Sequence, residues 1–180
     1  GRWFIIINII LIAISLSMDA FSLAFSYGIK GIALKEILIT AITVGFFHFF
    51  MPLLGNYFGI SLFSYTVLKP KFIMFFVFLF LSLDMVTHFF DDREKIRKLD
   101  IIGVFLFAIS VSFDSLSIGL GLSYLSYNII LSCLIFCIIS SFFTLLGFEL
   151  GKKLSKKIGR YSFLLGGIIL LFYSVWILTK

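Results

Sequence analysis

The segment Ile14-Ser-Leu-Ser-Met-Asp19-Ala-Phe-Ser22 recurs 95 residues later as Ile109-Ser-Val-Ser-Phe-Asp114-Ser-Leu-Ser117. A second match, at a separation of 92 residues, relates Leu53-Leu54-Gly55 and Gly59 to Leu145-Leu146-Gly147 and Gly151. Repetition at a fixed spacing indicates that a chain is built from copies of one structural unit. We therefore predict a first repeat over 1–90, a charged linker over 91–100 and a second repeat over 101–180.

The composition indicates that these repeats lie in a lipid bilayer and not in water. Of the 180 residues, 61% are hydrophobic and only 13% are charged, whereas a soluble domain carries about 25% charged residues. Six apolar runs each approach or exceed the roughly 20 residues that cross a bilayer as a helix: 3–27, 37–62, 72–90, 101–124, 129–150 and 161–178. These runs are too long and too uniformly apolar for β-barrel strands. We predict an all-α membrane protein with six transmembrane helices, and neither a cytosolic enzyme, a nucleic-acid-binding protein nor a secreted disulfide scaffold.

The number of spans in each repeat determines how the two repeats are related. Three is an odd number, so the second repeat enters the membrane from the opposite side to the first. This gives two inverted three-helix repeats with a pseudo-two-fold axis in the membrane plane. In many secondary transporters of this kind, the substrate site lies near the bilayer midplane between the repeats.

The basic residues predict the orientation. The first, third and fifth loops hold eleven of the 15 Lys and Arg residues, and the opposite side holds four, Arg2, Lys69, Lys71 and Lys180. Cytoplasmic loops carry the excess of basic residues. We therefore expect the odd-numbered loops in the cytoplasm, both termini outside, and the net charge of +6 to reflect topology and contact with anionic lipids.

Only four charged residues fall within the predicted spans, and all of them are acidic: Asp19, Asp84, Asp114 and Glu149. A carboxylate at the bilayer centre costs about 2.5–3.5 kcal/mol on insertion scales, so such a residue indicates a functional site. Asp19 and Asp114 lie near the middle of their spans and at equivalent positions of the two repeats. A set of buried acids without basic partners favours a cationic substrate.

Hydroxyl groups accompany both aspartates. Ser15, Asp19 and Ser22 follow helical spacing on one face of the first span, and Ser110, Asp114 and Ser117 repeat this pattern. Carboxylate and hydroxyl oxygens suit Mg, Ca or Mn, and two carboxylates match the charge of a divalent ion. These six residues form the predicted metal site. The alternative is that the serines bond to their own helix carbonyls while the aspartates pair, protonated, across the repeats.

Other polar residues are candidates for lining a pathway. Asp84 and His88 are one turn apart and form either an ion vestibule or an interfacial cap; Asn56 follows Pro52, which removes a backbone hydrogen bond. His48 is either a proton acceptor or ligand, or a neutral hydrogen-bonded residue.

For Glu149 an ion pair with the adjacent Lys152 or Lys153 is favoured over a role in transport. Cys133 and Cys137 are read as small apolar residues that hold no metal.

Several motifs resemble those of the MntP family of manganese efflux pumps, in the same order and over nearly the full chain: Ser17-Met-Asp-Ala-Phe-Ser22, Phe50-Met-Pro-Leu-Leu-Gly55, Ser112-Phe-Asp-Ser-Leu-Ser-Ile-Gly119, Leu146-Gly-Phe-Glu-Leu-Gly-Lys-Lys153 and Leu165-Gly-Gly167. The chain departs from the family pattern at Ser82-Leu83-Asp84, where a Gly-rich segment with a basic residue is expected. It also departs at Asn56, where the family often has Trp.

The resemblance implies export of Mn(II) from the bacterial cytoplasm across the plasma membrane, with Asp19 and Asp114 central to transport. Mn(II) is then a substrate, and no cofactor, nucleic-acid partner or enzymatic activity is expected. The protein contacts a divalent cation and the lipid bilayer, and a homo-oligomer is compatible with this interpretation. Without a nucleotide-binding signature, an ion gradient or the membrane potential must supply the energy, and proton antiport is one hypothesis. Export of another cation and a non-transporting sporulation-type membrane protein are the alternatives.

Overall fold

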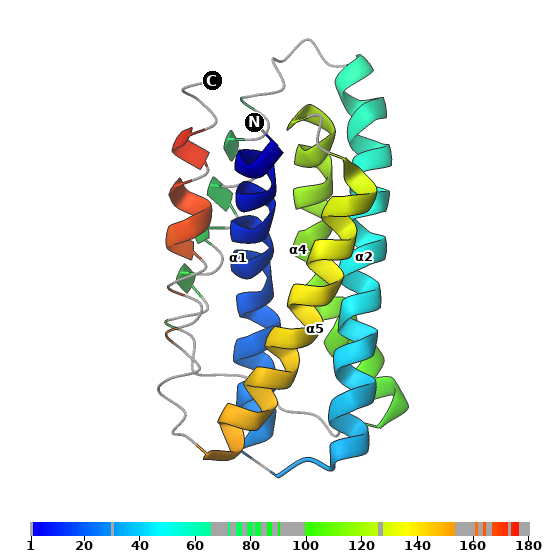
Figure 1. The fold of residues 1–180 in the computed structure, drawn as a ribbon, viewed down its shortest axis with the longest axis vertical. Coiled ribbons are helices and arrows are strands. Elements are labelled where there is room, and N and C mark those ends of the chain that lie inside the picture. Colours follow the sequence, from blue (N-terminus) through cyan, green and yellow to red (C-terminus); the bar gives the residue numbers. More distant parts are fainter. Residues whose placement is uncertain are drawn as a thin grey trace.

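The computed structural model describes residues 2–29, 31–65, 100–125 and 128–153, together with short stretches and single residues between 72 and 90 and between 161 and 176. Four long helices fill the continuous ranges (Figure 1): α1 (Arg2–Gly28), α2 (Leu34–Tyr65), α4 (Ile101–Leu125) and α5 (Ile129–Lys153). All four are long and apolar enough to cross a membrane, and no β-strand occurs in the described residues. The all-α prediction is therefore confirmed for this part of the chain, and its four helices have the length and composition of membrane spans.

Four of the six predicted spans agree with these helices to within a few residues. The linker lies outside the described residues except for Asp100, and the third and sixth predicted spans are described only as single residues and short stretches, so the count of six helices and the repeat boundaries remain predictions. Phe75, Leu170 and Trp176, which belong to those two spans, pack with an apolar cluster that includes Ile9 and Ile12 of α1. The hydroxyl of Ser82 donates a hydrogen bond of 2.8 Å to the carbonyl of Gly167.

The ends of the helices are set by local chemistry. Asp100 precedes α4, and its Oδ1 accepts a 2.7 Å hydrogen bond from the backbone N–H of Gly103. Asn128 precedes α5 and caps it through the N–H of Leu131, at 3.2 Å. Side-chain oxygens at this position satisfy donors that the first turn of a helix leaves unpaired. Between α1 and α2, Gly31 has a φ of 74°, a conformation that glycine adopts without strain.

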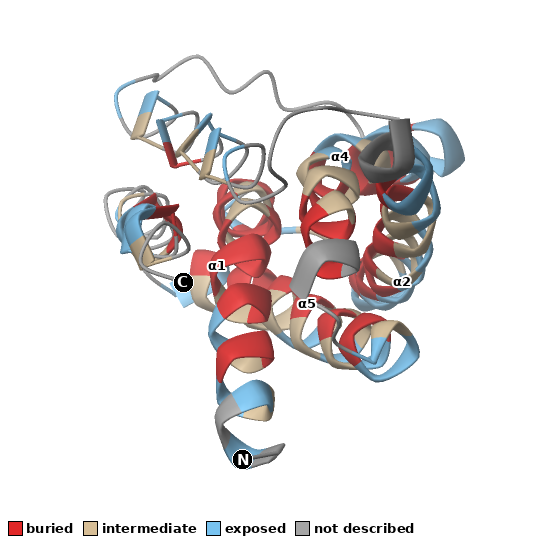
Figure 2. Cartoon of the chain, turned by 90° about the horizontal axis from the view of Figure 1, so that it is seen from above, coloured by how far each residue is buried: buried red, intermediate tan, exposed pale blue. Residues whose placement is uncertain are grey.

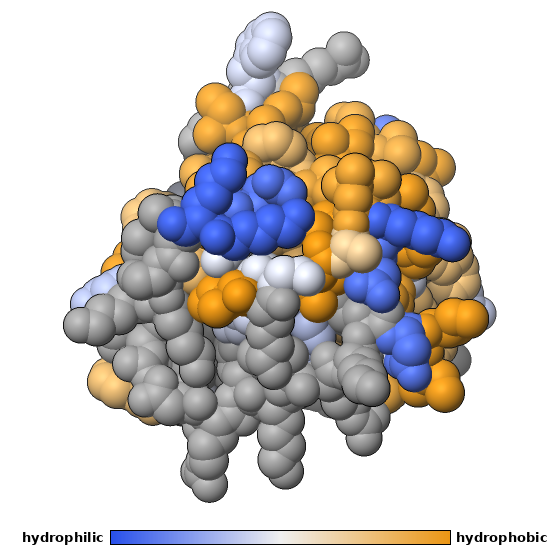
Figure 3. Space-filling model, turned by 90° about the horizontal axis from the view of Figure 1, so that it is seen from below, coloured by the Kyte–Doolittle hydropathy of each residue, from blue (hydrophilic) through white to orange (hydrophobic). Residues whose placement is uncertain are grey.

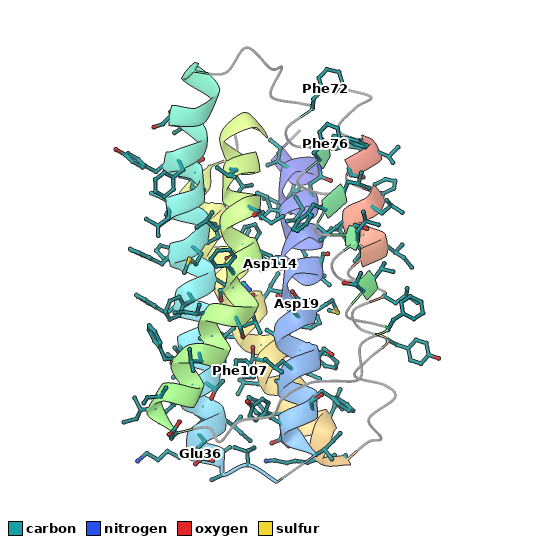
Figure 4. All side chains as sticks on the ribbon, turned by 180° about the vertical axis from the view of Figure 1, so that it is seen from behind. Asp19, Glu36, Phe72, Phe76, Phe107 and Asp114 are labelled. Atoms are coloured by element: carbon teal, nitrogen blue, oxygen red, sulfur yellow. The ribbon has the colours of Figure 1, made fainter. Side chains whose placement is uncertain are left out.

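Each of the four helices packs mainly on a helix from the other half of the chain. α1 packs mainly on α5, α4 packs mainly on α2, α2 also contacts α5, and α1 and α4 contact each other much less. Figures 1 and 4 show that α1 and α4 run in opposite directions along the bundle. A two-fold axis that exchanges α1 with α4 and α2 with α5 reproduces this set of contacts, because it converts the α1–α5 pair into the α4–α2 pair.

Glycines allow close backbone contact within these two pairs. A Cβ atom on Gly55 of α2 would collide with the carbonyl oxygen of Leu116 on α4, and one on Gly147 of α5 would lie 2.5 Å from the carbonyl oxygen of Phe21 on α1. Gly55 and Gly147 are separated by 92 residues and Phe21 and Leu116 by 95, the two spacings found in the sequence. The repeat in the sequence therefore corresponds to matched close packing, as expected for small residues in membrane helices.

The outside of the bundle is apolar along its sides and hydrophilic at one end. Buried residues face the interior of the four-helix group, and exposed residues lie on its outside, including large apolar side chains such as Trp3, Ile42 and Phe58 (Figure 2). In a membrane these exposed side chains face lipid. Hydrophilic side chains gather at the end seen from below in Figure 3, where α2 and α4 begin and α5 ends with Lys152 and Lys153.

Candidate metal site

Asp19 and Asp114 meet between the two halves of the protein. Figure 4 shows them at mid-height of the bundle, on α1 and α4 respectively, where these two antiparallel helices pass each other. The carboxyl group of Asp114 lies within hydrogen-bonding reach of that of Asp19. Oδ1 of each side chain is buried, although both residues as a whole remain partly exposed. The structure thus brings together two residues that are 95 positions apart in the chain.

The electrostatics of this pair are unfavourable unless something is bound. Two carboxylates in contact repel each other strongly in a medium of low dielectric. The four helices carry Lys and Arg only near their ends, so α1, α2, α4 and α5 supply no basic side chain at mid-height. Either a proton or a cation between the two groups removes the repulsion.

The carboxylate pair is not part of a larger cluster of strong ligands. Within the described residues, no group of three or more His, Cys, Asp and Glu side chains lies close enough to hold a metal ion. Cys133 is buried and Cys137 is partly buried, and both thiols are free. Within this part of the chain, further ligands to an ion between Asp19 and Asp114 would therefore be hydroxyl or carbonyl oxygens, with water as another source.

The serines predicted to accompany the aspartates occupy unequal positions. Ser15 and Ser22 of α1 are buried, and Ser117 of α4 is partly exposed. Ser110 is exposed, and its hydroxyl donates a 2.8 Å hydrogen bond to the carbonyl of Phe107 on its own helix. For Ser110 the structure thus shows the bond to its own helix that was the alternative to a ligand role.

Two interhelical hydrogen bonds flank the aspartate pair, and three of the four residues that form them were missed from the sequence. The Oγ atoms of Ser17 on α1 and Ser140 on α5 are 3.0 Å apart. Oγ of Ser112 on α4 lies 2.9 Å from Nδ1 of His48 on α2. The available signal was the Ser-x-Asp spacing, because Ser17 and Ser112 each precede an aspartate by two residues in both repeats.

His48 is completely buried, and its hydrogen bonds involve one ring nitrogen. Nδ1 lies 3.0 Å from the carbonyl oxygen of Val44, one turn earlier on α2, in addition to its contact with Ser112. Among the described residues Nε2 has no partner with good hydrogen-bond geometry, although the backbone of Leu16 on α1 also lies beside the ring. The structure shows hydrogen bonds at His48, as in one of the two interpretations of the sequence, and adds a bond to the helix that carries Asp114.

The other pathway candidates lie away from this centre or outside the described residues. Glu149 is exposed, and its Oε1 accepts a hydrogen bond from Nζ of Lys152 at 3.1 Å, which is the interfacial ion pair favoured from the sequence. Asn56 is partly exposed on α2, which stays helical through Pro52. Asp84 and His88 fall on residues that the structure does not describe.

Comparison with known proteins relates the whole chain to one family. The family model described as "Putative manganese efflux pump" matches residues 31–178. Relatives named "Putative manganese efflux pump MntP" are 36% identical in Oceanobacillus iheyensis, 34% in Halalkalibacterium halodurans and 31% in Methanobrevibacter smithii, each over 96% of both chains. No solved structure matches the chain. Because the family model matches most of the chain and these relatives are more than 30% identical over nearly its full length, the chain belongs to the MntP family.

Proposed function

We propose that this protein exports Mn(II) from the bacterial cytoplasm across the plasma membrane, as a secondary transporter whose ion site is formed by Asp19 and Asp114. The observation that carries the proposal is the contact between these two carboxyl groups at mid-height, one from each half of the chain. Paired unneutralised acids inside a membrane are costly and mark ion pathways. The names of the relatives indicate the ion.

The chemistry of the pair suits a divalent cation of this class. Two carboxylates carry the charge that balances Mn(II), and they provide the hard oxygen ligands that Mn, Mg and Ca prefer. The hydroxyls of Ser15, Ser22, Ser110 and Ser117 are the remaining candidate ligands on α1 and α4, with Ser22 and Ser117 one turn beyond their aspartates. Asn56 of α2 and Asp84 stay candidates for the pathway, whereas the ion pair with Lys152 favours an interfacial place for Glu149. His48 of α2 lies beside the site through its bond to Ser112.

The proposed architecture is a six-helix bundle of two inverted repeats. Antiparallel α1 and α4 and the exchanged packing of α1 with α5 and α4 with α2 support it. The basic residues favour the lower end in Figure 1, where α2 begins and α5 ends, as the cytoplasmic end, with both termini outside.

Export of Mn(II) needs an energy source, and proton antiport fits the site. Moving two positive charges outward against 100 mV costs about 4.6 kcal/mol. If Asp19 and Asp114 release the metal and each returns with a proton, the entry of two positive charges offsets the electrical cost of exporting Mn(II), and the carboxylates never face each other unneutralised.

The first experiment measures manganese in a bacterial strain that lacks its own exporter, grown in excess Mn(II). The parent protein is compared with Asp19→Asn and Asp114→Asn, and membrane accumulation of each variant is checked by immunoblot. Lower cell manganese with the parent alone supports the proposal. If the parent leaves cell manganese unchanged although it accumulates in the membrane, Mn(II) export is wrong, and Ca and Cd become the next ions to assay.

A second experiment tests the coupling. Liposomes that contain the purified protein are given Mn(II) on one side of the membrane. The rate of Mn(II) transport is then measured with the pH gradient in each direction. Antiport requires that a proton gradient opposite to the manganese flux accelerates it. An unchanged rate on reversal of the gradient would remove protons from the mechanism while leaving Mn(II) transport intact.

A further inference from the structure

The two hydrogen bonds beside the aspartate pair occupy equivalent positions of the two repeats. Ser17 and Ser112 differ by 95 residues, and His48 and Ser140 differ by 92, which are the separations that relate the first and second helices of each half. The pseudo-two-fold axis therefore converts the Ser17–Ser140 bond into the Ser112–His48 bond. Both bonds join an aspartate-bearing helix to its main packing partner.

Each bond holds its helix from the side opposite to the aspartate. Positions two apart on an α-helix point about 200° apart around the axis. While Asp19 faces α4, Ser17 faces α5, and while Asp114 faces α1, Ser112 faces α2. The two bonds and the aspartate pair thus link all four helices: Ser140 on α5 with Ser17 on α1, Asp19 on α1 with Asp114 on α4, and Ser112 on α4 with His48 on α2.

The packing gives these bonds a specific consequence. α1 and α4 contact each other little, while the α1–α5 and α2–α4 pairs are held by close glycine contacts. Direct packing between α1 and α4 therefore contributes little to fixing the distance between the two carboxyl groups. Their relative placement depends on how each aspartate helix is held on its own partner, in rotation and in height.

We propose that the Ser112–His48 and Ser17–Ser140 hydrogen bonds are matched clamps that orient Asp114 and Asp19 toward each other, and that His48 is a positioning residue for ion binding. The inference rests on the proposed ion site. His48 acts through Ser112 and does not touch the ion. A serine at position 48 can take its place, because Ser140 makes the equivalent bond with Ser17 at 3.0 Å.

Transport kinetics of purified protein in liposomes test the clamps, with the rate expressed per mole of folded, reconstituted protein. Interhelical hydrogen bonds of this kind contribute modestly in membranes, so His48→Ala and Ser112→Ala are each expected to raise the KM for Mn(II) about three- to tenfold. The double variant His48→Ala/Ser112→Ala should be no worse than either single variant, because both remove the same bond. His48→Ser should return the KM to within about twofold of the parent.

The matched control is Ser132→Ala on α5. Ser132 is also a buried serine, but its hydroxyl donates a 3.0 Å bond to the carbonyl of Asn128 on its own helix, so its removal should leave the KM at the parent value. A parent-like KM in His48→Ala and Ser112→Ala, additive losses in the double variant, or failure of His48→Ser to recover would each overturn the clamp. A parent that moves no Mn(II) would instead show that the proposed function itself is wrong.

Discussion

A single added methyl group at Gly55 tests the packing that holds the aspartate helices on their partners. A Cβ atom there would collide with the carbonyl oxygen of Leu116 and lie 3.0 Å from the Cα of Gly119. Both are backbone atoms, so no side-chain rotation can relieve the contact, and α2 must move away from α4. At Gly147 the added atom would meet the backbone of Phe21 and the Cβ of Ala24, at 2.5 and 3.0 Å.

Forcing extra volume into well-packed helices costs about 1–3 kcal/mol. For a chain of this length, each kcal/mol lowers the melting temperature by roughly 2–4 °C, so Gly55→Ala and Gly147→Ala should each melt about 2–12 °C below the parent. The pseudo-two-fold relation predicts similar shifts for the two variants. The assay is thermal unfolding of the detergent-solubilised protein, followed by the loss of the monodisperse peak in size-exclusion chromatography.

The control is Ile60→Ala, which removes an exposed side chain from the outside of α2 and should melt within about 2 °C of the parent. If Gly55→Ala melts together with this control, the close approach of α2 and α4 is wrong. If only one of the two glycine variants is destabilised, the halves do not pack equivalently, and the pseudo-symmetric interpretation fails.

Three further predictions follow from the structure. Mn(II) at about 100 times its Kd should stabilise the parent by about 2.7 kcal/mol, a rise in melting temperature of several degrees that Asp114→Asn abolishes; an equal rise in that variant would remove Asp114 from the binding site. Glu149→Gln should change stability by less than about 1 kcal/mol and leave transport unchanged, because its ion pair with Lys152 is exposed; loss of transport would restore Glu149 to the pathway. In a Cys133→Ala/Cys137→Ala background, Lys35→Cys and Lys153→Cys should react with an impermeant maleimide from the cytoplasmic side and Trp3→Cys from the opposite side, so labelling of all three from one side would refute the topology.

Much of the fold was predictable because the bilayer imposes simple constraints on a sequence. A helix that spans the membrane must be apolar over its whole length, and the boundaries of α1, α2, α4 and α5 were therefore predicted to within a few residues. The importance of Asp19 and Asp114 followed from the same constraint, since a carboxylate in an apolar span is costly. Periodicity on one helix was less informative for the serines: Ser110 shares a helix face with Asp114, but it is exposed and its hydroxyl bonds to its own helix, so its place in the site stays a prediction.

The sequence by itself determined the membrane class, the internal repeat and the identity of the two acids within apolar spans, because these depend on composition and on spacing along the chain. Only the tertiary structure decided which helices pair across the halves, that the carboxyl groups of Asp19 and Asp114 meet, and that His48 bonds to Ser112. These contacts join residues dozens of positions apart in the chain. They depend on the rotation and height of each helix, and close glycine packing sets both. Hydrophobic periodicity does not encode this placement, because these helices are apolar on every side.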